Sequence, residues 1–312
     1  MNSPAIVQEG KDGWIFLTGG TNNVLKLYSS SEGLEQQIID SWVDLIVSRQ
    51  ETLSKLGICY LHLFAPEKLS VYPEYFNTDL QDASFHPLGR FSSSYQKACS
   101  QTSSGNRFVN PLNYFEKQKK FFQLYWKTDS HWRFEGCYCA YQLICSSLGV
   151  QAVQDLHTRP FSEGMVTFDL GGKLDPIVRE KGRFYHLIKN AQRVGVNSIV
   201  EYKEANNLEN EGRLHVGSNV IFRNEDANVC RKKVILFGDS FSEYRTTLLS
   251  GMLAETFEEF HFVWSTSLDY SYIERVKPDI VLSECAERFM ARVPADDFDL
   301  ENYSKQRLSE FD

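Results

Sequence analysis

The sequence lacks a hydrophobic run long enough to cross a membrane. No window approaches the roughly 18 apolar residues of a spanning helix. The opening residues, MNSPAIVQEGKDGWIFL, also lack the basic stretch followed by an apolar stretch that marks a secretory signal. We therefore expect a cytoplasmic protein with no membrane insertion.

An excess of basic residues is also missing. The chain has 33 Lys and Arg against 41 Asp and Glu, and its formal net charge is −8 at pH 7. Nucleic acids and anionic membranes would be repelled by such a surface overall, so no nucleic-acid partner is expected. A local basic patch could still bind an anionic substrate.

The seven cysteines show no disulfide framework, because their number is odd and they are scattered through apolar segments. That pattern is typical of free thiols in a reducing compartment. Cys137 and Cys139 form the one close pair, but zinc sites usually need ligands two residues apart and a second pair, which does not follow. We expect no metal site.

What the chain does contain is ample material for a core. Of its 312 residues, 42% are hydrophobic and 13% aromatic, and this length suits a single α/β domain, spanning 1–312, with an insertion. An amphipathic helix at about 34–56 is followed by Gly57 and the apolar run 58–64, which predicts a buried parallel strand.

The last third of the chain alternates strands and helices. The expected elements are strand 233–237, helix about 242–256, strand 260–263, helix 269–275 and strand 279–283. This order predicts an α/β fold with a doubly wound, flavodoxin-like parallel sheet. Residues of about 155–230 are instead rich in Gly, Asn, Arg and Lys, with short alternating segments, and predict a β-rich insertion or lid.

Gly238-Asp-Ser240 directly follows an apolar strand. Gly238 permits a tight turn, and Ser240 would then lie at the carboxyl edge of the sheet, where open α/β sheets bind ligands. The free N–H groups of the next helix could stabilise an oxyanion there. The alternative is a polar turn in which Ser240 merely caps that helix.

A serine nucleophile needs a base held by a third group, and Thr128-Asp-Ser-His-Trp132 supplies both. Asp129 could hold the Nδ1 proton of His131 while Nε2 faces Ser240. The alternative is that Asp129 caps the helix predicted at 134–148 and His131 is a surface residue. Ser130 is also a candidate N-cap for that helix.

Together, Thr-Asp-Ser-His-Trp at 128–132 and Gly-Asp-Ser-Phe at 238–241 resemble the SGNH hydrolase-like O-acetyltransferases of the alginate acetylation type, in which Asp-x-His precedes the serine. The likeness spans nearly the whole chain and is weakest in the 170s to 220s. It extends to Gly10-Lys-Asp-Gly-Trp-Ile-Phe-Leu17, Ala65-Pro-Glu-Lys68, Val71-Tyr-Pro-Glu-Tyr75 and Cys285-Ala-Glu-Arg-Phe289.

The resemblance implies a catalytic triad of Ser240, His131 and Asp129 that moves an acetyl group to a sugar hydroxyl through an acetyl-serine. The sequence departs from the family pattern in two ways. Arg133 stands where the family often has Asn, and the sequence shows no export signal, although many members are exported or membrane-tethered. A cytoplasmic setting would make acetyl-CoA the donor, as a co-substrate, with no cofactor bound.

Several further residues are candidates for the site. Substrate binding is assigned to Trp132, Arg133, Gly172 and Arg245, and a backbone N–H of Gly171 or Gly172 could join the oxyanion hole. Glu284, Glu287 and Arg288 follow the last strand, where a structural ion pair is favoured over a place in the pocket.

The expected function is O-acetylation of a bacterial polysaccharide such as a capsule or exopolysaccharide. Its partners would be a polysaccharide or oligosaccharide acceptor and a polysaccharide-synthesis complex. Two alternatives stay open: a carbohydrate acetylesterase, in which water replaces the sugar, and an inactive carbohydrate-binding protein whose triad no longer turns over.

Overall fold

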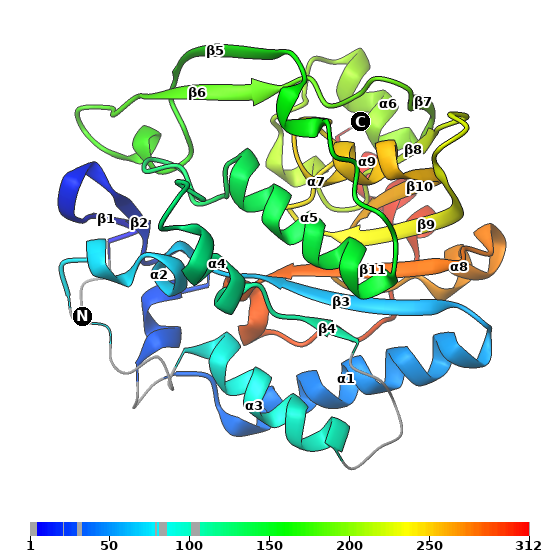
Figure 1. Cartoon of the computed structure of the whole chain (residues 1–312), viewed down its shortest axis with the longest axis horizontal. Coiled ribbons are helices and arrows are strands. Elements are labelled where there is room, and N and C mark those ends of the chain that lie inside the picture. The colour runs from blue at the N-terminus through cyan, green and yellow to red at the C-terminus, as the bar shows by residue number, and fades with distance from the viewer. Residues whose placement is uncertain are drawn as a thin grey trace.

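The computed structural model describes residues 5–20, 22–29, 33–78, 80, 86–100 and 107–311. A central sheet runs through the molecule, with α1 (Gln36–Lys55) and α3 (Pro87–Ser100) on one side and α5 (Phe134–Leu148) and α7 (Leu249–Thr256) on the other (Figure 1). Covering both faces with helices buries the apolar side chains of the central strands. The predicted fold class is confirmed.

The central sheet has seven strands in the order β4-β3-β11-β9-β10-β8-β7. The run from β4 to β10 is parallel, whereas β8 and β7 add antiparallel strands at one edge. Their bounds, in sheet order, are Phe108–Val109, Cys59–Ala65, Ile280–Ala286, Cys230–Gly238, Phe257–Trp264, Asn219–Arg223 and Gln192–Val196.

The segment predicted as a β-rich insertion divides into two parts. Strands β5 (Phe161–Val166) and β6 (Glu180–Tyr185) form a separate antiparallel hairpin, seen along one side of the molecule in Figure 1. Strands β7 and β8, with α6 (Ser198–Ala205) between them, instead extend the central sheet. A second small hairpin near the N-terminus pairs β1 (Val7–Glu9) with β2 (Ile15–Leu17).

Apolar spacing explains the long helix α1. It buries Ile39, Trp42, Ile46 and Leu53 on one face and ends before Gly57, which adopts φ 73°. The remaining helices are short: α2 (Lys68–Val71), α4 (Leu112–Gln118), α8 (Tyr270–Val276) and α9 (Leu300–Leu308). No helix within the described ranges is both long and apolar enough to span a membrane.

One predicted helix start is wrong, and so is one predicted N-cap, that of Ser130 for α5. Helix α7 begins at Leu249 rather than at about 242, because the Ser242 carbonyl accepts a hydrogen bond from the Ser250 hydroxyl (2.7 Å), where a continuous helix would use the N–H four residues on. Helix α5 has Arg133 as its N-cap, since the Ser130 hydroxyl is bonded to Asp169 (2.6 Å).

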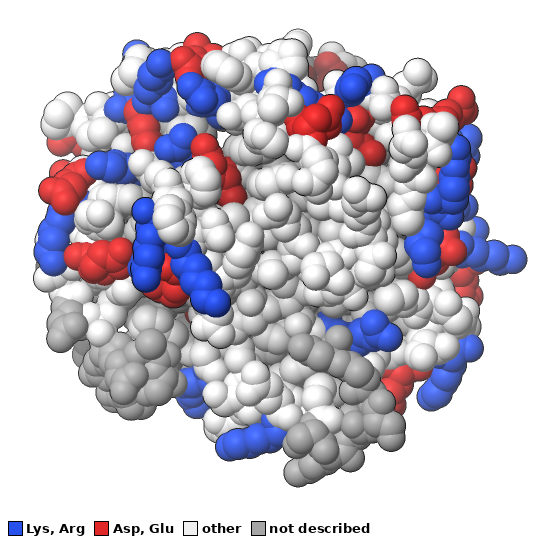
Figure 2. Space-filling model, in the orientation of Figure 1, with Lys and Arg blue, Asp and Glu red and all other residues white. Residues whose placement is uncertain are grey.

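The charged side chains on the face shown in Figure 2 lie mainly around its edge, with basic and acidic groups interspersed. The centre of this face, over α5, is uncharged, since Glu135 is the one charged residue of that helix.

Candidate active site

Strand β9 carries Ser240 to the carboxyl edge of the sheet, two residues beyond its last residue, Gly238. A Cβ at Gly238 would lie 3.1 Å from both a Glu284 carboxylate oxygen and the Ser242 Cβ. Glycine therefore lets the chain turn tightly against these side chains. The Asp239 carboxylate fixes the turn by accepting from the N–H groups of Phe241 (2.9 Å) and Ala286 (2.7 Å).

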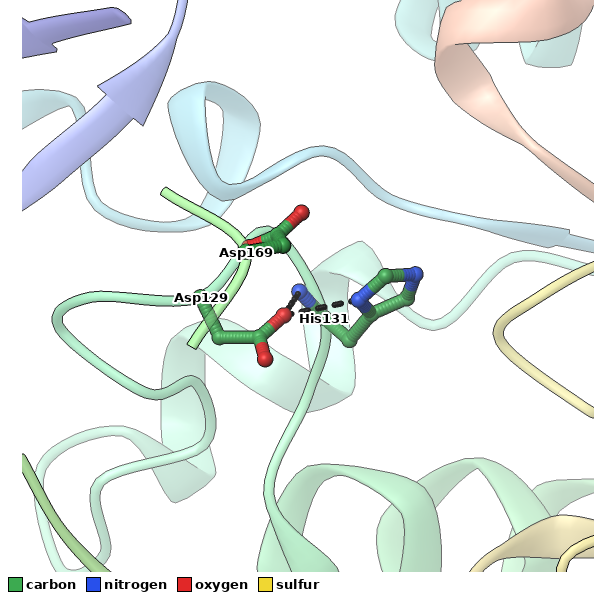
Figure 3. Close-up of side chains that lie close together, drawn as sticks. All are labelled: Asp129, His131 and Asp169. Atoms are coloured by element: carbon green, nitrogen blue, oxygen red, sulfur yellow. Dashed lines mark hydrogen bonds and ion pairs between the residues drawn. The ribbon is translucent and has the colours of Figure 1, made fainter. Parts of the chain in front are cut away.

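The structure brings Asp129, His131 and Ser240 together. The hydrogen bond between His131 Nε2 and Ser240 Oγ is 2.8 Å long, and that between His131 Nδ1 and Asp129 Oδ1 is 2.7 Å. Asp129 Oδ1 also accepts from the backbone N–H of His131 (2.8 Å). Figure 3 shows these two hydrogen bonds between Asp129 and His131. With Nδ1 donating to the carboxylate, Nε2 is left to accept the serine proton.

Charge and burial act in opposite directions on this pair. Burial alone would lower the pKa of His131, but the charge and hydrogen bond of Asp129 outweigh it and raise that pKa above its usual value. For Asp129 the directions are reversed: burial alone would raise its pKa, but the charge and hydrogen bonds of His131 outweigh burial and hold that pKa below the usual range. An ionised Asp129 therefore makes the imidazole a stronger base.

Residues of the insertion hold the turn that carries this pair. Glu180 accepts from the N–H (2.9 Å) and hydroxyl (3.0 Å) of Thr128, and Asp169 accepts from the N–H (2.8 Å) and hydroxyl (2.6 Å) of Ser130. The turn is thus fixed from outside by two carboxylates.

Asp129, His131 and Asp169 are the one group in the described part of the chain whose ligand atoms are close enough to hold a metal ion, all within 4.8 Å of one another. Figure 3 shows the Asp129 carboxylate turned toward the His131 ring, with Asp169 beside it. The oxygens of Asp169 accept from Ser130, and Asp129 Oδ1 accepts from His131. These hydrogen bonds account for the cluster without a metal.

Ser240 and His131 open into a cavity of about 540 Å³. Its walls are rich in aromatic rings, and among them Trp126 stacks on Phe168 with centroids 4.8 Å apart while His215 stacks on Trp264 at 4.6 Å. The lining also includes Trp132, Phe134, Phe184, Arg183, Asn210, Glu243, Arg245 and Thr247.

Of the four substrate-binding candidates, the structure places Trp132 and Arg245 in the cavity wall. Trp132 also donates from Nε1 to the carbonyl of Phe241 (3.1 Å), which links the His131 turn to the Ser240 turn. Arg245 is exposed and pairs with Glu243.

The other two candidates are not among the cavity-lining residues. The Arg133 guanidinium lies over the ring of Trp126, a residue of the cavity wall, 4.6 Å from its centroid. The Gly172 N–H donates to Phe168 (2.9 Å) and the Gly171 N–H to Thr128 (2.9 Å). Neither N–H is free for an oxyanion, so that expectation is wrong. The helix α7 starts too late to supply one either.

Glu284 near the end of β11, and Glu287 and Arg288 just after it, belong to structural hydrogen-bond and ion-pair networks, but with different partners from those expected. Arg288 pairs with Glu67 (2.7 Å) rather than with Glu284 or Glu287, and also donates to the Ser130 hydroxyl (3.2 Å). Glu287 accepts from the N–H groups of Glu67 (2.8 Å) and Leu88 (3.1 Å) and from the Ser70 hydroxyl (2.7 Å). Glu284 accepts from the Asp239 N–H (3.1 Å) and the Ser242 hydroxyl (2.9 Å).

Glu67 was not singled out as a site residue from the sequence. The sequence feature that could have indicated Glu67 is the Ala65-Pro-Glu-Lys68 stretch at the end of a buried strand. Burial raises the pKa of Glu67, against the opposing effect of the Arg288 charge.

The fold is shared with solved bacterial proteins of low sequence identity. The O-acetyltransferase domain of Pseudomonas putida AlgJ is 16% identical, with a TM-score of 0.57 over 97% of this chain and 99% of that one. Bacillus cereus PatB1, solved with a sulfonyl adduct, is 12% identical, with a TM-score of 0.62 over 92% and 97%. For Pseudomonas aeruginosa AlgX the values are 13% and 0.52, over 92% and 63%.

No curated protein sequence matches the chain. A family comparison does match, and over most of its length: residues 7–264 fit the family described as SGNH hydrolase-like domain, acetyltransferase AlgX. The matched span contains both the Asp129-x-His131 pair and Ser240. The chain therefore belongs to the AlgX family of SGNH hydrolase-like acetyltransferase domains, as its motifs predicted.

Proposed function

We propose that the protein is an O-acetyltransferase that acetylates hydroxyl groups of a bacterial polysaccharide through an acetyl-serine intermediate. The observation that carries the proposal is the hydrogen-bonded series from Asp129 through His131 to Ser240, opening into an aromatic cavity. The family match and the O-acetyltransferase activity named for AlgJ support acetyl as the group that is transferred.

In the first step His131 Nε2 takes the hydroxyl proton as Ser240 Oγ attacks the acetyl carbonyl. The bond from the acetyl carbon to the leaving group breaks, and His131 returns its proton to that group. As donor we propose acetyl-CoA, whose thiolate leaves readily. Asp129 stabilises the imidazolium between the two proton transfers.

In the second step a sugar hydroxyl gives its proton to His131 and attacks the acetyl-serine, and Ser240 leaves with that proton. The oxyanion formed in each step needs donors. The Ser240 N–H donates to no acceptor within the described residues, and we propose it as one of them.

The cavity walls suit a sugar. Apolar ring faces of a carbohydrate pack on aromatic side chains, and the Trp126–Phe168 and His215–Trp264 pairs offer such surfaces beside Ser240. Arg183, Asn210 and Thr247 provide polar groups at the same cavity for sugar hydroxyls.

The test is to incubate the protein with acetyl-CoA and a panel of bacterial polysaccharides while measuring free CoA and polymer acetylation together. A transferase gives equal amounts of both, and the Ser240→Ala variant gives neither. Acetate release from acetylated polysaccharide, without polymer acetylation from any donor, would replace the proposal with an esterase. Polysaccharide binding without either reaction would replace it with a binding protein.

A further inference from the structure

Lys68 is buried at the start of α2, directly behind the turn that carries Asp129 and His131. Only 2% of its surface is exposed. Its ammonium donates to three backbone carbonyls of one short segment: those of Trp126 (2.9 Å), Lys127 (3.0 Å) and Asp129 (2.6 Å). A lysine has three N–H donors, so this segment uses all of them.

The N-terminal hairpin closes over this contact. The Lys68 ammonium lies 5.7 Å from the Trp14 ring centroid and 5.6 Å from that of Phe16. The same hairpin binds the turn directly, since the Ile15 N–H donates to the Lys127 carbonyl (2.9 Å). In Figure 1, β1 and β2 accordingly lie beside α2. Two motifs outside the triad, around Trp14 and Lys68, thus converge on the Asp129 segment.

The surroundings of Lys68 are acidic. Asp129, Asp169, Glu180 and Glu67 all act on its charge through space, and each stabilises the ammonium form. The first three are the carboxylates that gather around the turn from Thr128 to His131. Carboxylates this close repel one another, and the buried ammonium of Lys68 offsets part of that repulsion.

We propose that Lys68 is a positioning residue that holds the Asp129–His131 segment in the geometry needed to activate Ser240. This rests on the proposed function, because it assumes that His131 is the base. Lys68 does not line the cavity and touches no reacting atom. It acts through the backbone of the segment, fixing the carbonyl of Asp129 and keeping a positive charge near the carboxylate that orients the imidazole.

Burial lowers the pKa of Lys68 to about 7, against the raising effect of the four carboxylates. The effect of desolvation therefore outweighs the attraction of these carboxylates.

Lys68→Met and Lys68→Gln are the test variants, and Lys119→Met is the matched control. The Lys119 ammonium also donates to a backbone carbonyl, that of Val71 at the other end of α2 (2.7 Å), and lies over the Tyr72 ring, but it does not contact the Asp129 segment. Each variant is measured for its melting temperature, for labelling of Ser240 by phenylmethylsulfonyl fluoride, and for hydrolysis of p-nitrophenyl acetate.

Both Lys68 variants should label Ser240 about 10²-fold more slowly than wild type, the scale expected when a catalytic group is misplaced by about 1 Å. For p-nitrophenyl acetate, kcat should fall while KM stays within about twofold, because Lys68 itself does not line the cavity. Lys119→Met should label at the wild-type rate, even if it melts lower. A purely structural Lys68 would instead lower the melting temperature without changing either rate in the folded protein.

The outcomes separate the two proposals. If wild-type Ser240 is not labelled and the ester is not cleaved, the proposed function fails. If the wild type reacts and both folded Lys68 variants react equally fast, only the positioning role is wrong. Lys68→Gln keeps two donors and guards against loss of folding in Lys68→Met; if neither folds while Lys119→Met does, Lys68 is a structural residue and the proposal is overturned.

Discussion

The loop that supports the triad offers a test with two adjacent glycines. A Cβ at Gly171 would clash with the Val178 carbonyl oxygen and lie 3.3 Å from the Thr128 Cβ, whereas a Cβ at Gly172 would meet only the Thr167 methyl, at 3.2 Å. Neither glycine has a positive φ, so the two substitutions differ in space alone. Gly171→Ala must therefore move the backbone, while a small side-chain adjustment accommodates Gly172→Ala.

The expected size follows from the contacts of that loop. The N–H groups of Leu170 (3.1 Å) and Gly171 (2.9 Å) bind the Thr128 carbonyl, and Asp169 binds Ser130, so a loop shift displaces the turn that carries His131. A displacement of about 1 Å would lower the rate of ester cleavage about 10²-fold. Overpacking should also cost about 1–3 kcal/mol of stability.

Both variants are compared with wild type for cleavage of p-nitrophenyl acetate and for unfolding in urea. Gly171→Ala should lose both activity and stability, and Gly172→Ala should keep kcat within about threefold of wild type, since its N–H stays bonded to Phe168. Equal activity in the two variants would refute the claim that this loop sets the position of the turn.

Three further predictions concern the triad and the network beneath it. Ser240→Ala should lower acetyl transfer by orders of magnitude and change unfolding free energy by at most about 1 kcal/mol, which rate assays and urea melts on the same sample check. Because Asp129 raises the pKa of His131, activity should fall as pH drops through a value above the usual one of about 6.5, and in a pH–rate profile Asp129→Asn should move that limb to lower pH. The same raised pKa contributes stability that is complete below about 6.5 and is lost as pH rises through the folded-state value. Arg288→Met should cost about 3–5 kcal/mol in a urea melt, since it leaves Glu67 buried and unpaired, and Glu67→Gln in the same chain should recover part of that loss.

Local patterns in the sequence predict the parts of the fold that local forces decide. The apolar run before Ser240 forms a buried strand because its side chains must leave water, and Gly238 allows the turn that follows. Asp129 and His131 are two residues apart, so their hydrogen bond is a local event that the sequence can predict. Their meeting with Ser240, by contrast, joins segments more than a hundred residues apart; the residue types suggested it and the family resemblance supported it.

Contacts between distant segments explain what the sequence did not predict. The start of α7 depends on a hydrogen bond from Ser250 to Ser242, and the availability of the Gly172 N–H depends on the fold of the loop between β5 and β6. Arg288 forms its ion pair with Glu67, more than two hundred residues away in the sequence, rather than with the nearby Glu284 or Glu287. Packing and the geometry of the available partners decide which groups pair, and neither can be predicted from the periodicity or composition of the sequence.

The central claim is that Ser240 carries the acetyl group on its way to a sugar hydroxyl, and rapid-quench mass spectrometry tests it most directly. The protein is mixed with an acetyl donor, quenched at short times with and without the polysaccharide acceptor, and digested to locate the adduct. We predict an acetyl group on Ser240 that accumulates without acceptor, is absent in His131→Ala, and disappears on adding acceptor as the polymer gains an equal amount. Polymer acetylation that proceeds at the wild-type rate with no acetyl group on Ser240 at any time would contradict the account.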